Sequence, residues 1–179
     1  MQYENPNAQP ELHYEKRKSL VSAYEDWNRS CHWSAHLTLR PNCSTENRKR
    51  FSEDIGCMFA DVERTIVGNK VYGRKKHFDR FRIYRAVYIE QENTDIHAHI
   101  LVHIPTPETH VKSYWGVDLE KRLCEAWSRR HNLDSQQVMR NFLWQPITTD
   151  GIHGYPVKEC LSIGNTDNWD DRSSRVPKN

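Results

Sequence analysis

The sequence lacks any long apolar run, and none of its segments approaches the ~20 apolar residues that cross a bilayer. The start of the chain, MQYENPNAQPELHYEKRK, also lacks the apolar stretch of a signal peptide. We therefore expect neither membrane insertion nor secretion, and we predict a cytoplasmic protein.

Cysteine is scarce and scattered, with five residues at positions 31, 43, 57, 124 and 160 and no C-x-x-C pair. An odd number at wide spacing fits neither a disulfide framework nor a thiolate zinc site. We expect reduced and mostly buried thiols. The phosphate-binding pattern G-x-x-x-x-G-K-[ST] is missing too, so we expect no ATPase activity from this chain.

An excess of one charge is also missing, since 26 Lys and Arg stand against 24 Asp and Glu. A net charge of +2 is too small to argue for a polyanionic partner, so local clusters must carry that argument. The 6 Trp, 8 Tyr and 5 Phe make full disorder unexpected. A chain of 179 residues suits one domain with a real core.

Hydrophobic periodicity and turn residues predict helices and strands in alternation. The expected helices cover residues 11–29, 44–68, 117–131 and 153–161, and the expected strands cover 33–40, 80–90, 96–104 and 138–147. The β-α-β-β-α-β order predicts an α+β domain, a ferredoxin-like antiparallel sheet with helices on one face. We expect a lead-in and helix over 1–32, the domain over 33–163 and a disordered tail over 164–179.

The strongest chemical signal is the pair His97 and His99. Side chains two residues apart on a strand project from the same face, so the two imidazoles can share one metal ion. A hairpin partner can add a carboxylate, and we prefer Glu90 to Glu92 because Glu90 ends the regular strand. Two histidines and one carboxylate suit Mn²⁺ or Mg²⁺ as a Lewis acid, with zinc a chemical alternative. The other interpretation is a polar strand face without a metal.

A second signal is Tyr155 with Lys158, which are neighbours on a helix at positions i and i+3. A free phenol has a pKa near ~10, and a nearby cation or metal that favours phenolate makes it a usable nucleophile. Attack on a phosphodiester would give an aryl phosphate ester that can be rejoined. The alternative is a buried aromatic beside a solvated lysine.

Basic residues alternate with aromatic ones between positions 70 and 85. Cations can contact phosphates while the rings stack on unpaired bases, which suits single-stranded or hairpin DNA. A solvated loop and strand edge is the alternative. The predicted nucleic-acid contacts are Arg74, Lys75, Lys76, Arg80 and Arg82.

Together these segments resemble the HUH endonucleases of the rolling-circle replication initiator (Rep) type. WSAHLTLR (33–40) resembles the first motif, IHAHILV (96–102) the His-hydrophobic-His motif, and Tyr155 with Lys158 the Y-x-x-K motif. The resemblance implies a metal on His97, His99 and a carboxylate, with Tyr155 as nucleophile and Lys158 as its helper.

Motif order separates the branches of that superfamily. Conjugative relaxases place the tyrosine before the histidines, whereas Tyr155 follows them here. Small HUH transposases usually carry Gln at the fourth place after the tyrosine, where this chain has Glu159. The Rep pattern therefore fits better, although a transposase of the same chemistry stays open.

The expected function is a metal-dependent, site-specific nickase and strand transferase on single-stranded DNA. A 5′-phosphotyrosine intermediate would start rolling-circle replication of a plasmid or phage-like element, and the expected partners are single-stranded or hairpin DNA, a host helicase and a polymerase, with no membrane. Two other classes stay open. One is a non-catalytic single-stranded nucleic-acid-binding module, and the other is a metal-dependent phosphodiesterase that uses water.

Overall fold

The structure is a computed structural model that describes residues 19, 22–23, 26–27, 31, 33–42, 47–69, 82–92, 95–103, 117–148 and 169–176. Its elements are β1 (Ala35–Leu39), α2 (Arg48–Val67), β2 (Arg85–Glu92), β3 (Asp95–Val102), α4 (Leu119–His131), α5 (Ser135–Asn141) and β4 (Phe142–Pro146). The predicted α+β class is confirmed.

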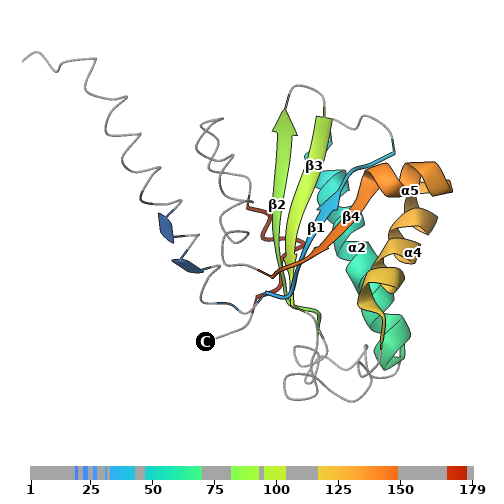
Figure 1. Cartoon of the computed structure of the whole chain (residues 1–179), viewed down its shortest axis with the longest axis horizontal. Coiled ribbons are helices and arrows are strands. Elements are labelled where there is room, and N and C mark those ends of the chain that lie inside the picture. Colours follow the sequence, from blue (N-terminus) through green and yellow to red (C-terminus); the bar gives the residue numbers. More distant parts are fainter. Residues whose placement is uncertain are drawn as a thin grey trace, which may run out of the picture.

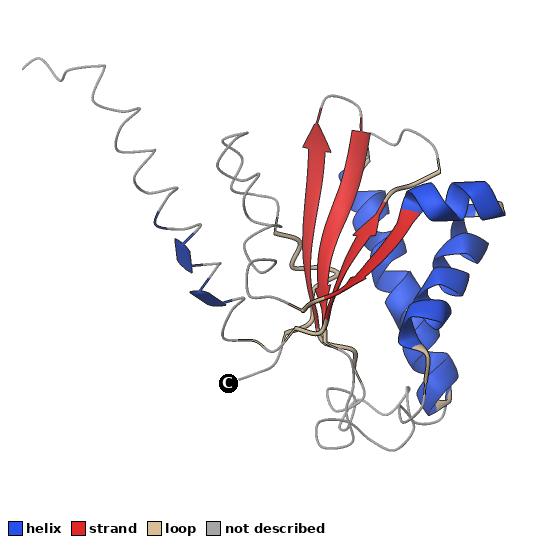
Figure 2. Cartoon of the chain, in the orientation of Figure 1, coloured by secondary structure: helices blue, strands red, loops and turns tan. Residues whose placement is uncertain are grey.

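The four strands form one sheet in the order β2-β3-β1-β4, and every neighbouring pair is antiparallel. The long helices α2 and α4 lie on the same side of this sheet (Figures 1 and 2). The strand order makes β3 and β1 the central strands. The opposite face of the sheet is left free of these two helices.

Alternation along the strands separates the two faces. Residues such as Leu37, Val87 and Ile100 point toward the helices and join the main core with Phe51 and Trp127. Trp127 is fully buried, and its Nε1–H donates to the carbonyl of Arg40 at 3.2 Å. The next residue along each strand points to the opposite face, which carries the polar side chains discussed below.

The chain from 138 to 147 differs from its predicted strand, because helix α5 continues to Asn141 before β4 begins. Asp134 accepts hydrogen bonds from the backbone N–H groups of Gln136 and Gln137, while the Gln137 side chain accepts from the N–H of Asp134. This capping box stabilises a helical start that the apolar pattern of the segment did not indicate. The strand prediction is wrong for residues 138–141.

The central hairpin is confirmed with shifted ends. Strand β2 begins at Arg85 rather than at residue 80 and continues to Glu92, and β3 already begins at Asp95. Glu92 pairs with Asp95 across the turn. The turn is thus shorter than the predicted segment 91–95.

The described residues test some of the remaining expectations and leave others untested. Cys31 and Cys124 are half-buried and Cys57 is exposed, which corrects the expectation of buried thiols for these three, while Cys43 and Cys160 lie outside the described residues. The helix predicted over 153–161 lies outside the described residues, as does most of the one predicted over 11–29. Among the described helices, none has the length and apolar character needed to span a membrane.

Residues 169–176 lie along the outer edge of β2. The Arg85 N–H donates to Arg175 O at 2.6 Å, the Arg175 N–H donates back at 2.8 Å, and the Asp170 N–H donates to Val87 O at 2.9 Å. Trp169 also forms a bridge with Tyr88. The expectation of a disordered tail is corrected for these residues, because backbone pairing and aromatic contacts fix them to the sheet.

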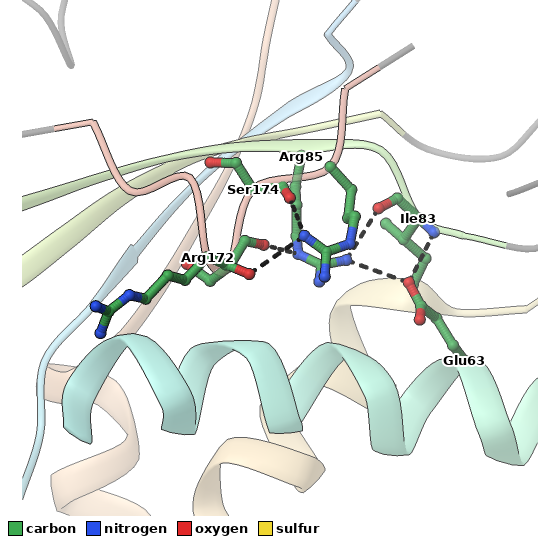
Figure 3. A network of polar contacts seen from close by, with 7 residues as sticks. Glu63, Ile83, Arg85, Arg172 and Ser174 are labelled. Carbon is green, nitrogen blue, oxygen red and sulfur yellow. Dashed lines mark hydrogen bonds and ion pairs between the residues drawn. The ribbon is translucent and has the colours of Figure 1, made fainter. Parts of the chain in front are cut away.

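A buried ion pair between α2 and β2 connects this segment to the domain (Figure 3). Arg85 and Glu63 are each 1% exposed, and the Arg85 Nη1–H donates to Glu63 Oε1 at 3.2 Å. The Arg85 Nε–H donates to the carbonyl of Ser173 at 2.6 Å, and its guanidinium lies 4.2 Å from the Phe59 ring centre. Burial lowers the pKa of Arg85 to about 10, against the opposing effect of Glu63. The pair thus links α2, β2 and the C-terminal segment.

Candidate metal centre

The β2–β3 hairpin brings one carboxylate opposite two histidines. Its register pairs Glu90 with His97 and Tyr88 with His99. Paired residues of antiparallel strands point to the same face, so Glu90, His97 and His99 share the face that α2 and α4 leave free. All three are buried, with exposed fractions of 0%, 8% and 5%.

The three side chains converge through their polar atoms. Glu90 Oε2 lies 3.1 Å from His97 Nε2 and 3.6 Å from His99 Nε2. The two imidazole rings are nearly perpendicular at 89°, with centres 5.1 Å apart. One ligand atom from each residue lies within 4.8 Å of the others, which makes a group that could hold one metal ion.

The surroundings of Glu90 fit a cation. Within the described part of the chain, neither carboxylate oxygen receives a hydrogen bond although both are buried. A buried carboxylate costs much free energy unless a positive charge or several donors compensate it. A divalent ion among these three side chains would supply that charge, and a set of two nitrogens and one oxygen suits Mn²⁺, Mg²⁺ or Zn²⁺.

A third histidine supports the site from the neighbouring strand. His36 on β1 is 2% exposed, and its Nε2 lies 3.1 Å from His99 Nδ1. The two rings are nearly parallel, at 18°, with centres 5.2 Å apart. His36 Nδ1 lies 3.4 Å from Gln145 Oε1, and Thr38 Oγ1 lies 3.3 Å from His99 Nδ1. Burial lowers the pKa of His36, while the Gln145 contact opposes that shift.

His36 was missed at the sequence level because it lies more than sixty residues before the histidine pair. The available signal was its alternation with Thr38 on one strand, which gives β1 a polar face rather than a purely apolar one. Only the pairing of Thr38 with His99 brings that face to the metal centre.

An aromatic cluster lies beside the centre. Tyr88, the strand partner of His99, contacts Trp169 edge-to-face with ring centres 5.5 Å apart. Trp169 in turn contacts Trp27 at 5.4 Å, and Trp27 contacts Trp33 at 6.3 Å. The C-terminal segment thus returns to the same sheet face as the histidines.

The remaining predicted site residues are not brought together in the described part of the chain. Arg82 is half-buried just before β2, and the side chain of Glu92 is not described. Six further predicted residues lie outside the described residues: Arg74, Lys75, Lys76, Arg80, Tyr155 and Lys158.

Comparison of the chain with protein-family models, curated proteins and solved structures finds no match in any of the three. The class defined by fold and site is therefore an α+β protein with a candidate metal centre of two histidines and one glutamate.

Proposed function

We propose that this protein is a metal-dependent nickase and strand transferase on single-stranded DNA, of the HUH replication-initiator type. The observation that carries this proposal is the buried group of Glu90, His97 and His99 on one hairpin. We also propose that the fold is ferredoxin-like, which the strand order β2-β3-β1-β4 supports.

In the proposed reaction, Glu90, His97 and His99 hold a divalent ion, Mn²⁺ or Mg²⁺. The bound ion supplies a Lewis acid for the scissile phosphate. The Tyr155 oxygen attacks the phosphorus, a Tyr–O–P bond forms, and the P–O3′ bond breaks. The released oxygen takes up a proton and becomes a 3′-hydroxyl, and the DNA remains attached as a 5′-phosphotyrosine. Lys158 favours the phenolate form of Tyr155.

Tyr155 belongs to the stretch of chain between β4 and Trp169. Both ends of that stretch are bonded to the sheet, which is compatible with the proposed role of Tyr155. At one end, the Ile147 N–H donates to the Ser34 carbonyl at 2.9 Å, beside β1. At the other end, Trp169 pairs with Tyr88 on β2. About twenty residues connect these points, and at roughly 3.3 Å per residue they are long enough to cross four strands spaced about 4.8 Å apart.

The proposed substrate is single-stranded or hairpin DNA with the basic residues 74–76, 80 and 82 on its phosphates. Strand separation would come from a host helicase, and the 3′-hydroxyl would prime a host polymerase for rolling-circle replication of a plasmid or phage-like element. Salt sensitivity of binding is expected, because each phosphate contact releases a counterion.

The test is a covalent-adduct assay on a denaturing gel, with the full chain, a pool of circular and hairpin single-stranded DNA, and Mn²⁺. We expect a protein band carrying DNA that disappears with EDTA, in Tyr155→Phe and in His97→Ala. Tyr84→Phe is the matched control, because Tyr84 lies just before β2 and contacts His103 rather than the metal centre, and it should keep the band.

Two other outcomes would contradict the proposal in different ways. DNA binding without any covalent band over many substrates would indicate a binding module. Metal-dependent cleavage that survives Tyr155→Phe would mean that water is the nucleophile.

A further inference from the structure

We propose that His36 is a positioning residue of the metal centre, which with Gln145 forms a hydrogen-bonded relay that makes His99 present its Nε2 lone pair toward Glu90. The relay crosses three strands, from β4 through β1 to β3. This inference rests on the proposed metal site and adds a residue from outside the hairpin to it.

The direction of the relay follows from counting donors. A neutral imidazole has one N–H donor and one acceptor nitrogen. The oxygen of Gln145 can only accept, so His36 Nδ1–H donates to it across 3.4 Å. His36 Nε2 is then an acceptor, and the His99 Nδ1–H donates to it across 3.1 Å. The proton of His99 is thereby held on the side away from Glu90.

The consequence is an unfavourable contact that a cation would resolve. With Nδ1 protonated, His99 Nε2 carries a lone pair and lies 3.6 Å from the Glu90 carboxylate oxygen. Two electron-rich atoms at that distance repel each other in a buried site. A metal ion that binds both atoms turns this repulsion into two coordinate bonds. The relay therefore prepares His99 for a metal rather than for a hydrogen bond to Glu90.

The Thr38 hydroxyl also favours a proton on His99 Nδ1. Its hydroxyl oxygen lies 3.3 Å from His99 Nδ1 and can accept the same proton. His36 is the stronger candidate because it is closer, its ring is nearly parallel to that of His99, and it is itself oriented by Gln145. Outer partners of this kind fix the tautomer and the ring orientation of metal-binding histidines.

The first test needs no metal. Ring ¹⁵N NMR of the metal-free full chain should show His36 and His99 both protonated at Nδ1 and unprotonated at Nε2. Loss of Gln145 in Gln145→Leu should redistribute the His36 tautomers, whereas Gln145→Glu keeps an acceptor and should preserve them. A wild-type His36 protonated at Nε2 would overturn the relay.

The second test is calorimetric titration of Mn²⁺ without DNA. His36→Leu should weaken Mn²⁺ binding by about 10- to 100-fold, the range typical for loss of an outer partner, and Gln145→Glu should bind as tightly as the wild type. His103→Gln is the control, because it alters a histidine just beyond β3 that contacts Tyr84. Thermal unfolding of each variant shows that it is folded.

The outcomes separate the two ideas. Unchanged Mn²⁺ affinity in a folded His36→Leu protein would overturn the positioning role while leaving the metal site in place. A wild-type protein that binds no Mn²⁺ would overturn the proposed function, and the positioning role with it.

Discussion

Glu90→Gln should stabilise the metal-free protein while it destroys metal binding. The substitution keeps the shape of the side chain but removes a buried negative charge that receives no hydrogen bond from the described residues. Relief of that charge should raise the free energy of unfolding by about 1–3 kcal/mol. Loss of the ligand should weaken Mn²⁺ binding by at least the ~100-fold that loss of an outer partner can cost.

Chemical denaturation with and without Mn²⁺ measures both effects. The wild type should gain stability from Mn²⁺, since a ligand that binds only the folded state stabilises it, and Glu90→Gln should gain little. If the metal-free variant is instead less stable than the wild type, Glu90 is already compensated by a protonated imidazole, and the metal-centre interpretation loses its physical basis.

Removing Glu63, the second deeply buried glutamate among the described residues, should have the opposite effect on stability. Glu63 is paired with Arg85 and also accepts from the Ile83 N–H at 2.9 Å. Glu63→Ala leaves a buried guanidinium without its counter-ion, which should lower the free energy of unfolding by about 3–5 kcal/mol. The same change should loosen the C-terminal segment, because Arg85 also holds the Ser173 carbonyl.

The measurement is urea unfolding monitored by tryptophan fluorescence. This signal reports on the C-terminal segment because Trp169 packs against Tyr88. Glu53→Ala is the control, since Glu53 lies on the same helix and is exposed, and it should change stability by no more than about 0.5 kcal/mol. A loss below about 1 kcal/mol for Glu63→Ala would show that the ion pair adds little beyond its own desolvation cost.

The contrast between Glu90 and Glu63 also shows what the sequence can predict. The alternation of His97 and His99 on a strand, with Glu90 opposite, follows from strand period and hairpin pairing, and the structure places these three side chains together. The apolar patterns likewise predicted the antiparallel sheet and the long helices. Local periodicity was sufficient for these features.

Features that depend on distant contacts were not predicted. The burial of Arg85 depends on Glu63 from α2 and on the carbonyl of Ser173. Both partners are distant in the sequence, so an arginine within a predicted strand does not indicate them. The role of His36 depends on which strands are neighbours. Helix α5 was missed for another reason, because its capping residues outweigh a weak apolar pattern.

The C-terminal segment has a consequence for how copies of this protein meet in solution. The outermost strand of a sheet presents unpaired N–H and C=O groups that can recruit a strand from another molecule and begin aggregation. On β2, both backbone groups of Arg85 are bonded to Arg175, and those of Val87 to Asp170 and to the Ser174 hydroxyl. The segment thus covers the first half of this edge, from Arg85 to Tyr88, and occupies the backbone groups that a second chain would pair with there.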